Sequence, residues 1–191
     1  MGQTLLGLGL IFLDKEAIIK HTNSFLEVYM QVRLMITGGT IDKVYNQSNG
    51  ELEFDKTHFP EMIIRSRIEV NIIQEELTLI DSLDMVDSDR HLILESCENC
   101  AEQFILITHG TDTMCETAKL LGERETKKTI VLFGSMVPYA VSNSDALFNF
   151  GCALGSLQLL GSGVYIAMNG RVLPWSDVEK NKSLGIFQNL N

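Results

Sequence analysis

Short apolar runs alternate with segments of helical character along most of the chain. Five of the runs are rich in β-branched residues and lack a regular apolar–polar alternation. They lie at 31–36, 70–74, 104–108, 129–134 and 164–168. Such runs are typical of parallel strands that are covered on both faces of a sheet. Segments with helical signals lie between them, at 57–67, 87–100, 113–122 and 144–160.

The segment 144–160 carries the clearest helical pattern. Its apolar positions recur at steps of three and four residues, at Leu147, Phe150, Leu154 and Leu157. One of residues 142–144 is expected to cap it. Gly151 and Gly155 each weaken a helix by about 1 kcal/mol relative to alanine. We therefore expect these two glycines to allow close approach to a neighbouring sheet.

Residues at the ends of the other helical segments also carry boundary signals. Asp55 precedes the segment 57–67 and is a candidate N-cap, and the aspartates that open 87–100 suit a first helical turn. Gly122 ends the segment 113–122 and is expected to be its C′ glycine.

The order of these elements predicts an α/β fold. Strands that alternate with helices form right-handed β-α-β units. We expect a doubly wound, mostly parallel five-stranded sheet with helices on both faces, flavodoxin-like or Rossmann-like, in a single domain over 30–191. Residues 1–29 are interpreted as an extension of uncertain structure, with a marginal amphipathic helix over 15–30. The apolar run at 5–13 is too short to span a bilayer and has no preceding Lys or Arg, so a signal peptide is a poor interpretation.

Composition narrows the function classes. The formal net charge of −10 provides no basic stripe for nucleic acid and implies weak repulsion from anionic membranes. Among the four cysteines, Cys97 and Cys100 form a C-x-x-C, which could be a redox pair or half of a zinc site. Because no second pair of ligands has suitable spacing, we expect no metal and no cofactor. Reduced structural thiols are favoured, and with them a cytoplasmic location.

Small or polar residues follow each predicted strand, where open α/β sheets build their sites. These loops are 37–40, 81–84, 109–113, 134–136 and 169–170. We expect a ligand in the crevice between the first and third strands. Gly39 would let backbone N–H groups approach it, and Ser135 comes from the fourth loop. No phosphate-binding glycine motif and no nucleophile elbow are present.

Two threonines in these loops are candidate nucleophiles. A hydroxyl needs a nearby base or phenol, and Tyr45 could supply one for Thr40, although it could equally be a surface tyrosine. Thr111 is followed by the carboxylate of Asp112, and a buried lysine such as Lys180 could serve it as base. His109 is expected to be a structural hydrogen-bonding group.

Five blocks in this order resemble the asparaginase/glutaminase family, specifically its amino-terminal domain. They are T-G-G-T-I, I-D-S-L-D-M, I-T-H-G-T-D-T-M-x-E-T-A, G-S-M-V-P and D-V-x-K at 177–180. The resemblance implies hydrolysis of the side-chain amide of L-asparagine or a related small amide through a threonine acyl-enzyme. It assigns the nucleophile to Thr40, the loop tyrosine to Tyr45, the α-carboxylate contact to Ser82, the second threonine to Thr111, the α-amino contact to Asp112 and the paired lysine to Lys180.

Three departures from the family leave other hypotheses open. The usual member has a carboxyl-terminal domain that this chain lacks, Leu83 replaces a residue that is often polar, and the loop from Thr40 to Tyr45 is short. The chain could be a catalytically silent module that binds a small amino acid, or an amidase subunit completed by a partner chain. The resemblance also implies a homo-oligomer, plausibly a dimer.

Overall fold

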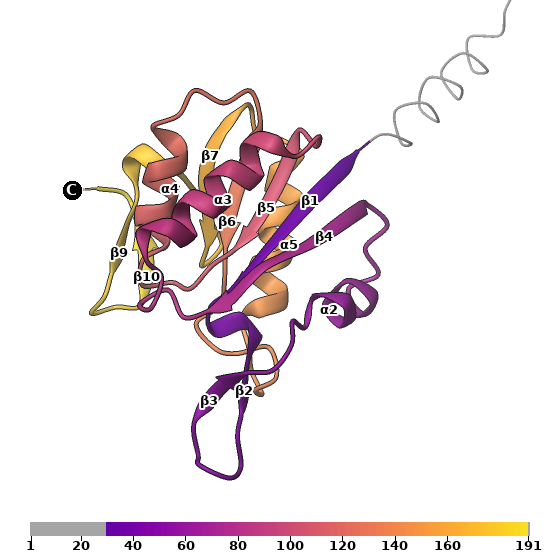
Figure 1. The fold of residues 1–191 in the computed structure, drawn as a ribbon, viewed down its shortest axis with the longest axis vertical. Coiled ribbons are helices and arrows are strands. Elements are labelled where there is room, and N and C mark those ends of the chain that lie inside the picture. The colour runs from indigo at the N-terminus through magenta and orange to yellow at the C-terminus, as the bar shows by residue number, and fades with distance from the viewer. Residues whose placement is uncertain (1–29, 191) are drawn as a thin grey trace, which may run out of the picture. The chain divides into compact units, whose positions relative to one another are not determined.

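The computed structural model describes residues 30–190. The predicted run at 5–13, and the predicted helix at 15–30 apart from Met30, lie outside the described residues. A six-stranded sheet forms the centre of the domain, in the order β4-β1-β5-β6-β7-β8 (Figure 1). Its strands are β1 (Gln31–Gly38), β4 (Asn71–Ile80), β5 (Phe104–Thr108), β6 (Thr129–Phe133), β7 (Gly163–Met168) and β8 (Arg171–Pro174).

The first five of these strands are parallel and match the five predicted apolar runs. When these five strands are numbered as they follow one another along the chain, their order across the sheet is 2-1-3-4-5, which is the flavodoxin-like arrangement. The predicted total of five strands is wrong because β8 adds an antiparallel edge to β7. Asn169 and Gly170, both with positive φ, form the two-residue turn that joins them. An Asn-Gly turn of this kind is a strong hairpin signal in the sequence.

Within residues 30–190, four α-helices cover the two faces of the sheet. They are α2 (Phe59–Arg65), α3 (Asp87–Asn99), α4 (Met114–Gly122) and α5 (Ala146–Leu157). The helices α3 and α4 lie together in front of the sheet in Figure 1. Their buried Ile93 and Leu121 share a core with Ile105 of β5. No helix within residues 30–190 is long and apolar enough to cross a membrane.

Aromatic packing forms the core beneath α2 and α5. The Phe133 and Phe150 rings are stacked, with centroids 5.4 Å apart. Phe59 packs edge-on against both, at 5.8 Å and 5.3 Å. All three side chains are buried, so α2 and α5 are joined to β6 through one aromatic cluster.

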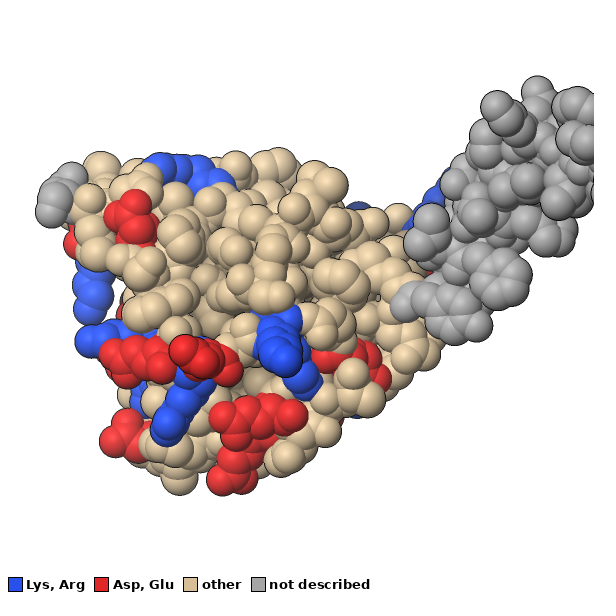
Figure 2. Space-filling view, turned by 90° about the horizontal axis from the view of Figure 1, so that it is seen from above, with Lys and Arg blue, Asp and Glu red and all other residues tan. Residues whose placement is uncertain are grey.

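Smaller elements extend from the carboxyl ends of the strands. They are the 3-10 turns η1 (Thr40–Asp42) and η2 (Trp175–Asp177) and the hairpins β2 (Lys43–Tyr45)–β3 (Leu52–Phe54) and β9 (Glu179–Asn181)–β10 (Ile186–Gln188). In Figure 1 the β2–β3 hairpin projects away from the sheet. Seen from above, acidic and basic side chains lie interspersed among uncharged residues (Figure 2).

Several helix boundaries differ from the sequence prediction. Asp55 is not a cap, because α2 begins at Phe59 and has proline in its first turn. The N-cap of α5 is Asp145 and not a residue of 142–144. The Asp145 carboxylate accepts hydrogen bonds from the amides of Met136 and Val137, each at 3.0 Å, and so ties the loop after β6 to α5.

The three glycines predicted to end a helix or to allow close packing of one have other roles in the structure. Gly122 is the last residue of α4 and not a C′ residue, since the cap Glu123 has right-handed helical geometry. A Cβ atom on Gly122 would lie 2.3 Å from the Trp175 ring, so this glycine allows close packing. Gly151 and Gly155 have no neighbouring atom within 4 Å of a would-be Cβ, so the predicted close approach there is wrong.

Candidate active site

The loops after β1 and β5 touch through two glycines. Gly39 has φ +80°, and a Cβ atom on it would lie 2.4 Å from the Gly110 nitrogen. Any side chain would therefore strain the backbone and separate the two loops. Because the next residue of each loop is a threonine, this contact brings the backbones of Thr40 and Thr111 side by side.

The loop after β4 packs against the same place. Ser82 is buried, and a Cβ atom on Gly110 would lie 2.5 Å from the Ser82 Oγ atom. Thr113 donates a hydrogen bond of 2.8 Å to the Ser82 carbonyl oxygen. Within the described residues the buried Ser82 Oγ atom has no hydrogen-bond partner. A buried hydroxyl without a partner is costly, so this group is available for a ligand.

Lys180 joins this cluster from strand β9. Its Nζ atom lies 2.8 Å from Thr111 Oγ1 and 2.9 Å from Asp112 Oδ1. The lysine side chain is 10% exposed and the aspartate side chain 39% exposed, so the ion pair is buried on the lysine side. The Lys180 amine thus contacts a hydroxyl and a carboxylate at once, an arrangement through which the proton of the hydroxyl can be moved.

An ion pair that the sequence did not predict connects the β2–β3 hairpin to the Ser82 loop. Lys43 Nζ binds Asp81 Oδ2, and the Leu83 amide donates 3.0 Å to the other oxygen of Asp81. Burial opposes the charge of Asp81, but these two contacts outweigh it and lower the pKa of that carboxyl. Asp81 lies in the predicted site loop 81–84 and Lys43 in the loop from Thr40 to Tyr45, but no sequence pattern pairs the two residues.

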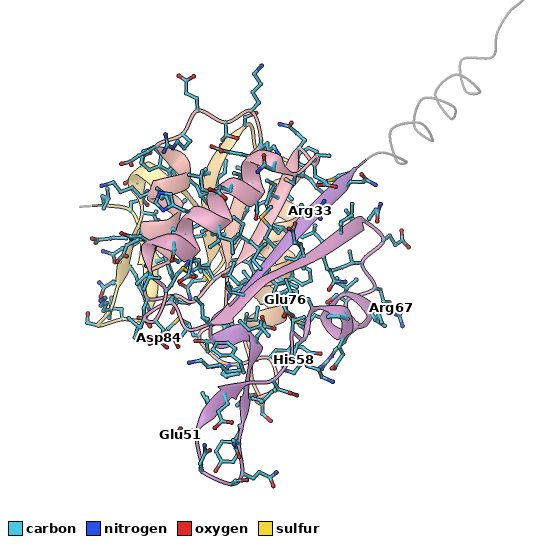
Figure 3. All side chains as sticks on the ribbon, in the orientation of Figure 1. Arg33, Glu51, His58, Arg67, Glu76 and Asp84 are labelled. Atoms are coloured by element: carbon cyan, nitrogen blue, oxygen red, sulfur yellow. The ribbon has the colours of Figure 1, made fainter. Side chains whose placement is uncertain are left out.

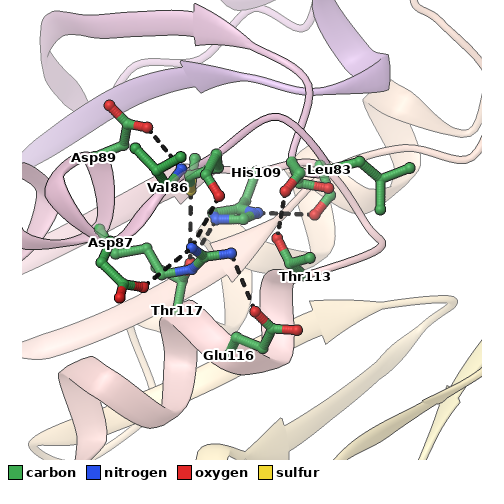
Figure 4. A network of polar contacts seen from close by, with 12 residues as sticks. Leu83, Val86, Asp87, Asp89, His109, Thr113, Glu116 and Thr117 are labelled. Carbon is green, nitrogen blue, oxygen red and sulfur yellow. Dashed lines mark hydrogen bonds and ion pairs between the residues drawn. The ribbon is translucent and has the colours of Figure 1, made fainter.

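His109 lies beneath the site in a network of polar contacts (Figure 4). Its ring is fully buried, with Nδ1 2.8 Å from the Gly110 carbonyl oxygen and Nε2 2.7 Å from Thr117 Oγ1. Burial lowers the pKa of His109 to about 4. The ring is therefore neutral near pH 7, where it donates to Gly110 and accepts from Thr117. This agrees with its predicted structural role.

Arg90 extends this network to the helices α3 and α4. Its guanidinium donates a hydrogen bond of 3.0 Å to the Met85 carbonyl oxygen and one of 3.1 Å to the Glu116 carboxylate. Arg90 was not among the predicted site residues, because it lies in the middle of a helical pattern. Its contacts hold the loop that carries Ser82 against α4.

Asp42 anchors the turn that begins with Thr40. Its buried Oδ1 atom accepts a hydrogen bond of 3.1 Å from the Thr57 hydroxyl and one of 3.0 Å from the His58 amide. Burial raises the pKa of Asp42, although these hydrogen bonds oppose the rise. Figure 3 shows His58 between this turn and α2.

No hydrogen bond or ion pair within residues 30–190 joins this cluster to the side chain of Thr40, Tyr45 or Ser135. Tyr45 is 60% exposed on the β2–β3 hairpin, the element that also carries the labelled Glu51 in Figure 3. Ser135 is buried, and its hydroxyl donates 2.7 Å to the Val137 carbonyl oxygen. The part of the chain that the structure describes contains no cluster of three or more metal-binding side chains.

Known proteins share this arrangement of loops on the sheet. The family model for the N-terminal domain of asparaginase matches residues 31–189. The chain belongs to the asparaginase family. The L-asparaginase of Thermococcus kodakarensis is 28% identical over 169 residues, which are 85% of this chain and 52% of that protein. The "Probable L-asparaginase periplasmic" of Haemophilus influenzae is 32% identical over 168 residues, 81% of this chain and 47% of that protein.

Solved structures of asparaginases have the same fold. The thermostable L-asparaginase of Thermococcus kodakarensis superposes with a TM-score of 0.73 at 29% identity, covering 85% of this chain and 52% of that one. The probable cytoplasmic L-asparaginase of Campylobacter jejuni gives 0.71 at 26% identity, covering 84% and 53%. The chain therefore spans about half the length of the asparaginases that it matches.

Proposed function

We propose that the chain hydrolyses the side-chain amide of L-asparagine or a related small amide, releasing ammonia through an acyl-enzyme on Thr40. The contact of Lys180 Nζ with Thr111 Oγ1 and Asp112 Oδ1 supports this most strongly. A module that only bound an amino acid would need no buried amine against a hydroxyl. The Gly39–Gly110 contact adds support, because it sets the two threonines at one sheet edge.

In the proposed binding mode, the substrate's α-groups occupy the polar side of the cluster. Ser82 Oγ, buried without a partner, donates to the α-carboxylate. Asp112, whose carboxylate is partly exposed, accepts from the α-ammonium group. The side-chain amide then points toward Thr40, and the loop of Ser135 closes the far side.

The reaction proceeds in two halves. Thr40 attacks the amide carbon as its hydroxyl proton is relayed through the Tyr45 hydroxyl to the amide nitrogen, and the C–N bond breaks as ammonia leaves. Backbone N–H groups beside Gly39 and Thr111 stabilise the oxyanion, by about 3–4 kcal/mol per donor in comparable sites. Thr111, held by its hydrogen bond to Lys180 Nζ, then orients a water molecule that attacks the acyl group, and a water proton passes to Thr40 Oγ1 as the acid product leaves.

An amide panel tests this proposal. Purified full chain is incubated with asparagine, glutamine and small amide analogues, and ammonia release is measured alongside aspartate binding. We expect release with at least one amide. Aspartate binding without release from any amide would instead favour the binding module. Release only after a partner chain is added would favour the subunit hypothesis.

We also propose a reducing, cytoplasmic environment and association between copies of the chain. All four cysteines are free thiols, which suits a reducing compartment. Exposed apolar side chains border the site loops, namely Leu83, Met136 and Leu184. Their burial between copies would remove apolar surface from water. Sedimentation velocity of the full chain measures the association, and a monomer at all concentrations would contradict it.

A further inference from the structure

A thiol and an amine meet at the opposite edge of the sheet from the candidate active site. Cys100 caps the end of α3, and Lys128 precedes β6. The Lys128 Nζ atom lies 3.2 Å from Cys100 Sγ and also donates to the Cys100 carbonyl oxygen. Nothing in the proposed hydrolysis uses either residue.

The backbone holds both partners in place. The Cys100 amide donates 3.0 Å to the Ser96 carbonyl oxygen. The Lys128 backbone amide donates a hydrogen bond of 3.1 Å to the Thr126 hydroxyl. The Lys128 carbonyl oxygen accepts one of 2.9 Å from the Gly163 amide. No ion pair to Lys128 is present among residues 30–190. Among the described residues, the Lys128 amine therefore contacts the cysteine and forms no ion pair with a carboxylate.

The two cysteines of the C-x-x-C differ in their surroundings. Cys97 is 3% exposed, its thiol points to Met35 Sδ at 3.7 Å, and burial raises its pKa to about 12. Cys100 is half-buried and lines a surface hollow of about 400 Å³ together with Arg33 and Glu95. Of these two thiols, Cys100 is the one that a small oxidant can reach.

We propose that Cys100 and Lys128 form a redox-modification site in which peroxide produces a reversible covalent S–N cross-link. Peroxide first transfers one oxygen to Cys100 Sγ, giving the sulfenic acid and one water molecule. The Lys128 amine, after its proton passes to solvent, then attacks the sulfur. The S–N bond forms, the S–O bond breaks and a second water molecule leaves. The sulfur is oxidised by two electrons, and the single peroxide molecule is reduced.

Peptide mapping of the full chain after hydrogen peroxide treatment tests this site. We expect one cross-linked peptide pair joining residues 100 and 128, lighter by two hydrogens than the separate peptides and released by a thiol reductant. Cys115 and Cys152, which are also half-buried, provide internal controls and should not be linked to lysine. A Cys97–Cys100 disulfide, or a link that retains an oxygen atom, would overturn the proposed bond.

The variant Lys128→Arg distinguishes oxidation of the Cys100 sulfur from the later attack of the Lys128 amine on that sulfur. It retains the positive charge and donor groups but removes the nucleophilic amine. With a carbon nucleophile that traps sulfenic acids, labelling of Cys100 should rise several-fold over the unsubstituted chain, while labelling of Cys152 should not change. Equal labelling of Cys100 in both proteins would show that Lys128 does not capture the oxidised sulfur. Because neither residue takes part in amide hydrolysis, failure of either proposal leaves the other standing.

Discussion

At the scale of single residues, the candidate site depends on groups that are useful only in contact. Lys180 and Thr111 lie 69 positions apart in sequence, yet their polar atoms are 2.8 Å apart. Thr111 is marked by its position after a strand and beside Asp112, whereas Lys180 has no local pattern that marks it as functional. A lysine near a chain end is ordinarily a solvated surface residue, and only the motif resemblance selected this one.

The pair of Thr111 and Lys180 should behave as one unit in mutants. Thr111→Val and Lys180→Met should each lower kcat by roughly a thousandfold, because each removes one end of the same proton transfer. The double variant should then be little worse than either single variant. Steady-state ammonia release measures this, with Lys127→Met, a lysine away from the site, as control. Multiplicative losses in the double variant would show that the two residues act separately.

His109 should make stability depend on pH in a defined window. Burial lowers its folded-state pKa from 6.5 to about 4, so between these values the unfolded chain binds a proton that the folded chain does not. The free energy of unfolding should therefore fall as the pH falls through this window, by roughly 3 kcal/mol in total.

Urea unfolding at a series of pH values checks the role of His109. Asp42, whose pKa is raised by burial, contributes a slope of opposite sign, so the comparison is made between variants. In His109→Gln the free energy of unfolding should no longer fall as the pH falls from 6.5 to about 4. In His91→Gln, a substitution at an exposed position, it should still fall. An unchanged slope in His109→Gln would contradict the assignment.

At the scale of elements, the β2–β3 hairpin is expected to contribute to turnover through Tyr45, although that side chain contributes little to stability. Tyr45 is 60% exposed on it. If the hairpin folds over the site, Tyr45→Phe should lower kcat by roughly a hundredfold or more. The free energy of unfolding should change by less than about 0.5 kcal/mol, as for other surface substitutions. Tyr165→Phe, which removes an exposed hydroxyl far from the site loops, is the matched control. Unchanged turnover in Tyr45→Phe would remove Tyr45 from the mechanism.

Helix α5 contains two glycines that the packing does not require. A Cβ atom at Gly151 or Gly155 meets nothing within 4 Å. Gly151→Ala and Gly155→Ala should each stabilise the protein by about 1 kcal/mol, since alanine favours the helix and restricts the unfolded chain. Thermal or urea unfolding measures the gain, and Gly122→Ala should instead destabilise through its clash with Trp175. A loss of stability at both α5 positions would contradict this packing.

These glycines also show where sequence reasoning stops. A pattern identifies glycine as a weak helix residue, but it does not tell what lies opposite. Gly122 was predicted to be a C′ residue and is instead the last residue of α4 and a packing contact. Gly151 and Gly155 were predicted to be packing contacts and face open space. Tertiary neighbours decide the role, and they come from distant parts of the chain.

At the scale of the whole molecule, the sequence predicted the parallel sheet well and its additions poorly. The five parallel strands were predictable because each is a continuous apolar run, buried on both sides. The strand β8 and the two hairpins were missed because each of their strands has only three or four residues. Their stability comes from pairing with a neighbour, so it leaves little periodicity to detect. The doubly wound topology still placed the loops of the candidate site at one edge.

The nucleophile assignment of Thr40 is the centre of this account. The most direct measurement is ammonia release from asparagine by the full chain and by Thr40→Ala, with equal thermal unfolding confirming that the variant folds. We expect release by the full chain and a fall of about a thousandfold or more in Thr40→Ala, because the proposed mechanism assigns the attack on the amide carbon to the Thr40 hydroxyl. Near-normal release by Thr40→Ala would contradict the account.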